Sequence, residues 1–263
     1  MALVRGRTLT HLPSLALLFL MAGLAGCVFA RPTPNAQLER WSPEYGYRYM
    51  RLPQAPDGSS DSLFLIASFS GGGMRASALA YGALQELARQ QITWEGKQER
   101  LLDELSLVTA LSGGSFTAAY YSLYGDRIFH DFESRFLRKD WQLALKSKVF
   151  LNPYNWLRLL SPHFGRAHLL SELLDEALFD GQTFGDLLKR NRRPMVFIHA
   201  SDMATLSRFE FNQRQFDLIC SDLSQLPISQ ATAASSAIPL LLSPISLKNY
   251  AGKCGFQSPA WLN

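Results

Sequence analysis

The sequence has little cysteine, little charge and no long block of like-charged residues. Its 263 residues include 3 Cys, and 18% of them are Asp, Glu, Lys or Arg. Three cysteines are too few to staple a chain of this length, which excludes a disulfide-rich scaffold. Because 17 Phe, 9 Tyr and 5 Trp can supply a core, full disorder is excluded as well. The length suits one large domain or two small ones.

The net charge of +4 is too small and too dispersed to indicate a nucleic-acid-binding protein. A short basic cluster at 189–193 is more typical of a solvated helix end. We therefore expect no nucleic-acid partner.

Residues 1–26 have the pattern of an export signal and not of a folded segment. Arg5 and Arg7 precede an uncharged apolar run over 15–24, which is shorter than the ~20 residues that cross a hydrocarbon core. The next residues, Leu24-Ala25-Gly26-Cys27, resemble the lipobox of bacterial lipoproteins. This resemblance implies cleavage before the cysteine and acylation of it, which gives stable anchoring when two or three chains are attached. A plain secretory signal is the alternative.

The lipobox predicts a lipid-anchored protein of the bacterial cell envelope, on the periplasmic side, with the outer membrane preferred. Residues 27–60 are rich in proline, arginine and aromatic residues, and we expect a lipidated tether and an irregular arm there. The folded domain is expected over 61–263. Outside the cytoplasm Cys220 and Cys254 could form a disulfide, although a pair of buried thiols fits the sequence nearly as well.

Strand-like and helix-like segments alternate along the domain. Apolar runs typical of strands buried in a parallel sheet occur at 62–69, 105–110 and 195–200. Helices are expected at 74–90, 115–124, through much of 126–190, and at 229–237. Residues 209–211 and 216–218 flank a polar turn, as in a hairpin. The alternation predicts an α/β protein with a mainly parallel sheet flanked by helices.

A glycine-rich turn, Ser70-Gly71-Gly72-Gly73-Met74-Arg75, follows the first predicted strand. Glycines let the backbone approach a ligand, and the helix start beyond them presents unpaired N–H groups. Such a turn can bind an anion or the oxyanion of an acyl-transfer intermediate. Close strand–helix packing, with the arginine paired to a carboxylate, is the structural alternative. Neither the phosphate-loop nor the dinucleotide pattern is complete, so we expect no nucleotide. We also expect no other cofactor and no metal.

A serine lies in the turn after the second predicted strand. Ala110-Leu111-Ser112-Gly113-Gly114 differs at one position from G-x-S-x-G, the nucleophile elbow that lifts a serine above the end of a sheet. Ser112 is favoured as nucleophile over Ser115, which lies one turn into the following helix. Both turns are expected at the C-terminal edge of the sheet, where open α/β sheets place their sites.

Together these motifs resemble the patatin-like phospholipase family. Residues 70–76 are similar to its glycine-rich oxyanion motif, in the form seen in cytosolic phospholipases, and residues 111–120 are similar to the elbow and helix of bacterial members. Residues 231–239 resemble its late Ala-Ser-x-Ala-Ile-Pro segment. The resemblance implies a three-layer sandwich and a Ser–Asp dyad that hydrolyses membrane phospholipid or lysophospholipid esters. It implies these site residues: Ser112 as nucleophile, the amides of Gly71, Gly72 and Gly73 as oxyanion hole, and Arg75 as support for that loop or for the lipid phosphate.

One part of the family pattern is not found. The dyad aspartate of the family belongs to an Asp-Gly-Gly or Asp-Gly-Ala motif that follows the Ala-Ser-x-Ala-Ile-Pro segment. The Asp-Gly pairs here, Asp57-Gly58 and Asp180-Gly181, both precede that segment. A serine nucleophile without its base loses orders of magnitude in rate. The sequence therefore predicts a domain that is incomplete at its C-terminus and has little or no lipase activity.

Two other functions fit parts of the pattern. A membrane-tethered lipid-binding or interaction protein would keep the fold without the dyad. A Ser–His–Asp esterase would combine Ser112 with His199, but in that class the histidine comes late, and no histidine follows residue 199 here. The resemblance to the patatin-like family requires no histidine, and it gives structural roles to the following residues: His130, His163, His168 and His199.

Overall fold

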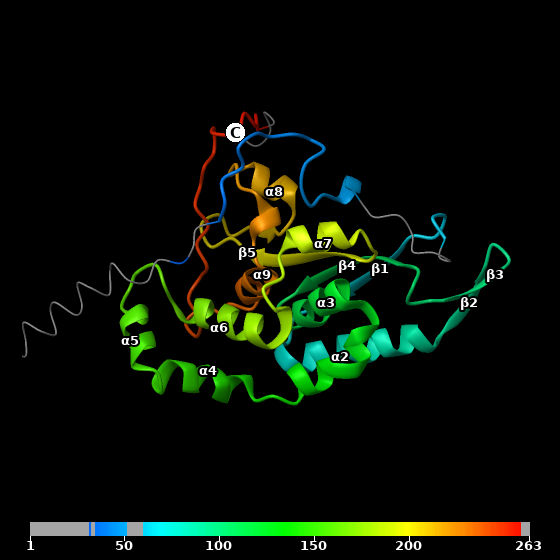
Figure 1. Cartoon of the computed structure of the whole chain (residues 1–263), viewed down its shortest axis with the longest axis horizontal. Helices are drawn as coiled ribbons and strands as arrows, with labels where there is room; N and C mark the ends of the chain where they lie inside the picture. Colours follow the sequence, from blue (N-terminus) through cyan, green and yellow to red (C-terminus); the bar gives the residue numbers. More distant parts are fainter. Residues whose placement is uncertain (1–31, 33–34, 52–59, 259–263) are drawn as a thin grey trace, which may run out of the picture.

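The computed structural model describes residues 32, 35–51 and 60–258. The expected signal segment, Cys27 and the Asp57-Gly58 pair lie outside the described residues. The centre of the fold is a four-stranded sheet in the order β1-β4-β5-β6 (Figure 1).

Three of the four strands of this sheet are parallel. They are β1 (Leu65–Phe69), β4 (Leu105–Leu111) and β5 (Met195–Ser201), and β6 (Arg208–Glu210) runs antiparallel to β5. The central strand β4 is buried over most of its length, as expected for a strand covered on both faces. The predicted α/β fold with a mainly parallel sheet is confirmed.

The register of the sheet aligns the ends of its parallel strands. Ala110 of β4 lies opposite Phe69 of β1 and Ile198 of β5, and Leu111 lies opposite His199. The turns that follow β1 and β4 therefore leave the sheet at the same edge, beside the last residues of β5.

A helix begins directly after each of these two turns. α2 (Gly73–Arg89) follows the glycine-rich turn, and α3 (Gly113–Tyr124) follows the serine turn. The two helices pack together through a buried hydrogen bond of 2.7 Å between the hydroxyls of Ser77 and Thr117, and the Thr117 hydroxyl also donates to the Ser77 carbonyl. This contact fixes the distance between the two helix starts.

The remaining elements surround this centre. They are the hairpin β2 (Gln91–Trp94) and β3 (Lys97–Arg100), and the helices α4 (Trp141–Phe150), α5 (Pro153–Leu159), α6 (Arg166–Leu174), α7 (Phe184–Arg190), α8 (Gln213–Asp217) and α9 (Ile228–Ser235). Short 3₁₀ turns and two π-helical stretches, Ile128–Leu137 and Asp175–Phe179, join them. Among the described residues, none of the helices has the length and apolar character needed to span a bilayer.

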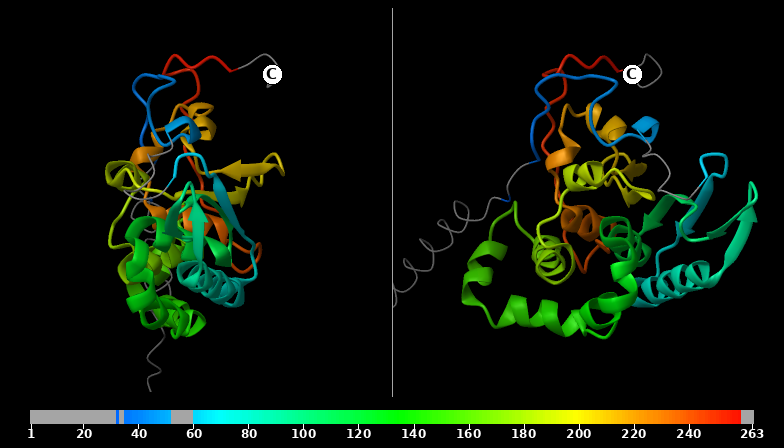
Figure 2. Two further views of the ribbon diagram at one scale, coloured as in Figure 1. Left: turned by 90° about the vertical axis from the view of Figure 1, so that its right-hand side faces the viewer. Right: turned by 45° about the vertical axis from the view of Figure 1, so that its right-hand side comes forward.

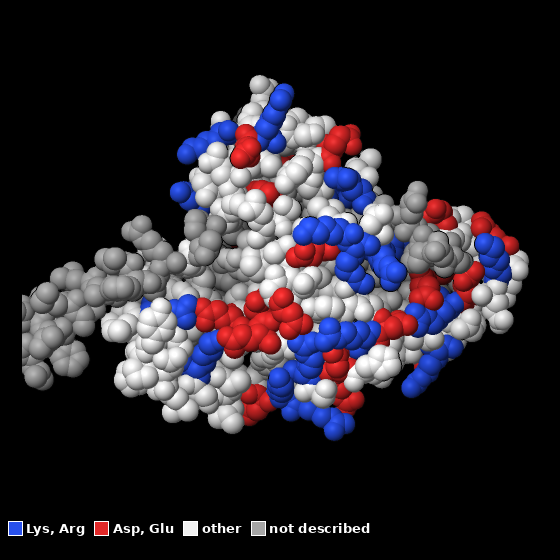
Figure 3. Space-filling view, in the orientation of Figure 1, with Lys and Arg blue, Asp and Glu red and all other residues white. Residues whose placement is uncertain are grey.

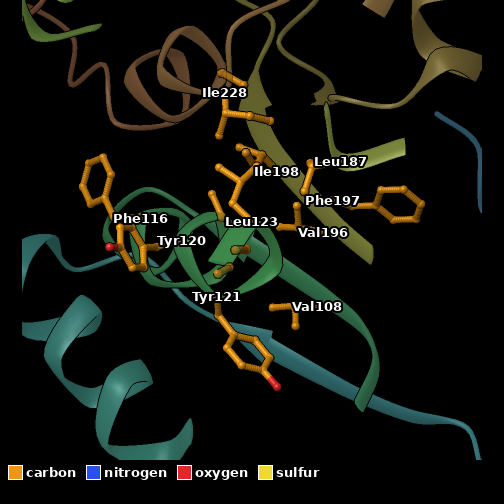
Figure 4. Packing of buried hydrophobic residues seen from close by; sticks show 14 of the residues in the cluster. Val108, Phe116, Tyr120, Tyr121, Leu123, Leu187, Val196, Phe197, Ile198 and Ile228 are labelled. Carbon is orange, nitrogen blue, oxygen red and sulfur yellow. The ribbon is translucent and has the colours of Figure 1, made fainter. Parts of the chain in front are cut away.

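The main hydrophobic core lies between the sheet and α3. Val108 of β4 and Val196 and Ile198 of β5 meet side chains of α3 such as Leu123 there (Figure 4). Tyr47, from the irregular segment before β1, is also buried in this core. Its hydroxyl donates to the Val196 carbonyl and accepts from the Val196 amide, at 3.1 and 2.8 Å. The segment 35–51 thus completes the part of the β5 edge that β6 does not reach.

A second, smaller cluster holds the segment 35–51 to the end of the described chain. Cys220 and Cys254 form a disulfide in the structure, and Leu38 and Tyr250 pack beside it. The Leu38 amide donates to the Cys220 carbonyl at 2.8 Å. Segments far apart in the sequence are therefore joined at this corner of the molecule.

The expected hairpin over 209–218 is wrong. Residues 208–210 form β6, which pairs with β5, and residues 213–217 form α8. The Asn212 side chain accepts a hydrogen bond from the Gln215 amide and caps this helix, as asparagine does at helix starts. Phe209, Phe211 and Phe216 pack against one another, so the apolar residues that suggested a second strand are used in core packing.

Candidate active site

Ser112 occupies a strained turn between β4 and α3. Its backbone has φ 49° and ψ −123°, and a non-glycine residue held in such a conformation costs on the order of 1–3 kcal/mol. This is the sharp strand-to-helix reversal of a nucleophile elbow. The Ser112 residue is half-buried, so it lies at the protein surface.

The glycines after Ser112 are required by contact with the neighbouring turn. A Cβ atom added to Gly113 would lie 2.0 Å from the carbonyl oxygen of Gly73, and one added to Gly114 would lie 2.7 Å from that of Ser70. Both distances are shorter than any side-chain carbon tolerates. The serine turn and the glycine-rich turn are therefore in direct backbone contact.

The glycine-rich turn also lies beside the serine itself. A Cβ atom added to Gly71 would lie 3.2 Å from the Ser112 Cβ and 3.9 Å from its Oγ. Gly72 and Gly73 have φ angles of 139° and 62°, a region that glycine enters without steric cost. The backbone at Gly71 thus passes close to the serine hydroxyl. It does so just before α2 begins, where the first N–H groups of the helix have no intrahelical acceptor.

A second serine ties the elbow to β5. The Ser112 amide donates to the Ser235 hydroxyl at 2.7 Å, and that hydroxyl donates to the His199 carbonyl at 2.6 Å. Ser235 is the last residue of α9 and belongs to the 231–239 segment. Sequence reasoning did not identify it as a site residue, although the resemblance of that segment to the family motif was a signal.

Ser115, the rival nucleophile, is used within the turn. Its side chain is fully buried, and its hydroxyl donates to the Ser112 carbonyl at 2.5 Å. The Ser115 amide donates to the same carbonyl at 2.9 Å. These bonds close the first turn of α3 and point the Ser115 hydroxyl away from solvent.

Arg75 lies on the exposed side of α2, in its first turn. Within the described part of the chain its guanidinium has no hydrogen bond and no ion pair, so a structural pairing with a carboxylate is not seen there. An exposed cation beside the glycine-rich turn is available to a bound anion.

The His199 side chain is not joined to Ser112. Burial lowers the pKa of the imidazole, and the nearby Glu210 carboxylate raises it by a smaller amount. Its Nδ1 lies 3.5 Å from Glu210 Oε2 but makes no hydrogen bond within the described residues. The imidazole thus lies beside Glu210, and only the backbone carbonyl of His199 takes part in the elbow.

Neither of two aspartates that could act as a base, Asp202 and Asp180, is bonded to Ser112. Asp202, just after β5, accepts hydrogen bonds from the Ala204 amide and the Thr205 hydroxyl, and these bonds lower its pKa. Asp180, from the second Asp-Gly pair, lies beside Tyr124 at the far end of α3 and is paired with Arg135 at 2.9 Å. In the ranges 35–51 and 60–258, no carboxylate or imidazole is hydrogen-bonded to the Ser112 hydroxyl. Nor do His, Cys, Asp and Glu side chains of the described residues gather into a group that could hold a metal ion.

Fold and site together define an α/β protein with a serine elbow and a glycine-rich turn at the C-terminal edge of a mainly parallel sheet. The patatin-like phospholipase family model matches residues 67–254, a range that includes both turns and the 231–239 segment. The chain belongs to this family, and the resemblance drawn from the motifs is confirmed.

Solved structures of human GIVD cytosolic phospholipase A2 are similar to the chain. One, in complex with methyl gamma-linolenyl fluorophosphonate, matches with a TM-score of 0.45 and 16% sequence identity. The match covers 82% of the present chain and 32% of the phospholipase chain. Another structure of the same enzyme matches with a TM-score of 0.41 and 19% sequence identity. That match covers 72% of the present chain and 30% of the phospholipase chain. The chain thus spans less than a third of the length of these structures. No curated protein matches it.

Proposed function

We propose that the chain is a membrane-anchored lipid acyl hydrolase that acts on phospholipid or lysophospholipid esters with Ser112 as nucleophile. The observation that carries this proposal is the contact between the strained serine turn and the glycine-rich turn, in which Gly71 lies against Ser112. Family membership supports the choice of a lipid ester as substrate.

The reaction would follow the usual course of acyl transfer. The Ser112 Oγ forms a bond to the ester carbonyl carbon as its proton passes to solvent water, and the amides of residues 71–73 stabilise the oxyanion. The bond to the alcohol then breaks, and the alcohol takes up a proton. Water hydrolyses the acyl-serine in a second step, which releases the fatty acid and restores the serine. Arg75 is exposed beside the turn and would support it or pair with a lipid phosphate.

The proton of Ser112 has no acceptor among the groups that the structure describes around it. The family dyad would supply an aspartate there. Without such a base the nucleophile loses orders of magnitude in rate. We therefore propose that this chain by itself hydrolyses esters slowly, while the serine remains able to react with strong acylating or phosphonylating reagents.

Membrane anchoring is the second part of the proposal. The lipobox-like sequence that ends at Cys27 supports attachment of acyl chains to that cysteine, and the envelope location follows from it. Incorporation of labelled palmitate into the chain, lost in Cys27→Ser, is the expected result. Equal incorporation in both would contradict this part of the proposal and leave the serine chemistry untouched.

A fluorophosphonate probe tests the nucleophile directly. We expect slow covalent labelling of the full chain, its complete loss in Ser112→Ala and its persistence in Ser236→Ala. Ser236 is the matched control because its hydroxyl is buried and lacks a hydrogen-bond partner within the described residues. Labelling that survives Ser112→Ala and disappears in Ser115→Ala would overturn the assignment. Rapid ester hydrolysis by the parent chain, abolished in Ser112→Ala, would overturn only the proposal of low activity.

A non-catalytic lipid-binding protein is the second candidate function. One observation favours this function: among the described residues, no base is hydrogen-bonded to the Ser112 hydroxyl. The absence of any probe labelling in a folded chain would support this candidate over the hydrolase. A Ser–His–Asp esterase would instead show labelling that depends on His199, and the side chain of His199 makes no contact that supports this.

A further inference from the structure

The helices α4 and α5 carry a group of exposed apolar side chains. Each of the seven is between 44% and 79% exposed: Leu143, Phe150, Leu151, Tyr154, Trp156, Leu157 and Leu160. We call these residues the α4–α5 apolar surface. The two helices form an outer corner at one end of the molecule (Figure 2), and this corner is largely free of charged groups in the space-filling view (Figure 3).

The opposite sides of the same two helices are apolar as well. Leu145, Val149 and Leu159 pack against a buried pair, Phe164 and Leu169. A helix that is apolar on both sides is normally buried on both, yet no part of the described chain covers the outer side of this corner. Exposed apolar patches of this kind mark interaction sites.

Hydrogen bonds within and between α4 and α5 order these side chains in the folded state. The Asn152 side chain caps α5 by accepting from the Tyr154 amide at 3.0 Å. Asn155, which is 2% exposed, donates to the Lys148 carbonyl at 2.8 Å. The indole of Trp156 donates to the carbonyl of Val149 at 2.7 Å, which joins α5 to α4 and leaves half of the residue exposed.

The charged side chains of the segment 141–171 are all positive, and the acidic partners of two of them come from the neighbouring residues Glu172 and Glu176. Residues 141–171 contain no Asp or Glu and four Lys or Arg. Two of the four, Lys148 and Arg158, are paired with Glu172 at the far end of α6. The other two, Lys146 and Arg166, are exposed and form no ion pair with any described residue. The α4–α5 apolar surface is thus accompanied by unpaired positive charge.

We propose that the α4–α5 apolar surface docks on the interfacial layer of a bilayer that contains anionic lipids. Apolar side chains, an indole and a phenol on one face, with Lys and Arg beside them, are the features of segments that lie in a membrane interface. A second copy of the chain fits less well, because a symmetric contact sets the same patch of both copies face to face and so brings positive charge against positive charge. The choice of a lipid partner rests on the proposed function, whereas the surface itself does not.

A local reporter tests the docking. In the full chain with Cys27→Ser, an environment-sensitive fluorophore is placed at Leu151→Cys, and a matched label at Leu79→Cys on α2, where the native side chain is 76% exposed. The disulfide keeps Cys220 and Cys254 from reacting. Each protein is titrated with vesicles of phosphatidylcholine alone or with added phosphatidylglycerol.

The label at residue 151 should shift to shorter wavelength with phosphatidylglycerol vesicles, and the label at residue 79 should not. Replacing both Lys146 and Arg166 by glutamine should weaken the partitioning by about fivefold per charge removed. No shift at residue 151, or an equal shift at residue 79, would overturn the proposal. So would a shift that grows with protein concentration in the absence of vesicles, which would assign the surface to a second copy. Ser112→Ala should leave the shift unchanged, so failure of docking and failure of hydrolysis are separable.

Discussion

Replacement of Ser235 by alanine should loosen the serine elbow. The Ser235 hydroxyl accepts the Ser112 amide at 2.7 Å and donates to the His199 carbonyl at 2.6 Å. Removal of this hydroxyl leaves the amide without an acceptor in a turn that is already strained at φ 49°. A fully buried polar group left without a partner costs about 1–3 kcal/mol, and the lower end of that range applies to this part-buried amide. We expect the free energy of unfolding to fall by about that amount, measured by urea denaturation with circular dichroism.

The same change should slow the chemistry of Ser112. If the transition state needs the native geometry of the elbow, a loss of elbow stabilisation raises the activation free energy. An increase of about 1.4 kcal/mol in that activation free energy makes the reaction tenfold slower. Fluorophosphonate labelling of Ser235→Ala should therefore be about tenfold slower than that of the parent chain, and Ser235→Thr, which keeps the hydroxyl, should recover part of the loss.

Ser236→Ala is the matched control for both measurements. The Ser236 hydroxyl is buried and makes no hydrogen bond to the described residues, so its removal should leave the free energy of unfolding unchanged or slightly raised. Equal stability and equal labelling rates for Ser235→Ala and Ser236→Ala would refute the assignment of Ser235 as a positioning residue.

Three further predictions concern the stability of the fold. Gly113→Ala should lower the free energy of unfolding by more than about 3 kcal/mol or prevent folding, because its Cβ would meet a carbonyl oxygen at 2.0 Å. The control is Gly82→Ala on α2, whose Cβ would meet nothing within 4 Å. It should raise the free energy of unfolding by about 0.5–1 kcal/mol, measured by denaturant titration. Burial lowers the pKa of His168, whose Nδ1 accepts the Gly165 amide. The unfolded chain therefore binds the proton first, so stability should fall as pH drops below about 6.5, with a shallower fall in His168→Gln. Reduction of the Cys220–Cys254 disulfide, which closes 34 residues, should cost about 3–4 kcal/mol on the chain-entropy model, and an unchanged midpoint in reductant would contradict this.

The sequence was sufficient to predict the fold class and the approach of the two turns. Both predictions depend on local patterns, since each turn directly follows a buried strand and parallel strands end at a common edge. The small residues around Ser112 indicated that strand and helix come close together there. The positive φ angle of Ser112 and the glycines at 113 and 114 are the structural form of that close contact.

The link between the elbow and Ser235 could not be predicted in this way. It joins Ser112 to a residue 123 positions later and then to a carbonyl in β5, and it exists only because the parallel register brings residue 199 beside residue 111. Nothing in the local pattern distinguishes Ser235 from Ser236. The expected hairpin over 209–218 failed for a related reason, because alternating apolar residues fit a strand and a short aromatic-packed helix equally well.

The separate cluster beneath α4 and α5 has a consequence for how the molecule opens. Phe164 and Leu169 are grouped with Leu145, Val149 and Leu159 and not with the main core. Among the described residues of α4 and α5, Trp141 alone packs against that core, which α6 joins through Leu170 and Leu174. Such a corner is a candidate for a cooperative unit with its own opening free energy, below that of global unfolding. A destabilising substitution in the corner would then raise the population of the locally opened state without unfolding the whole chain. The turn that holds Ser112 would keep its geometry while the corner opens and closes.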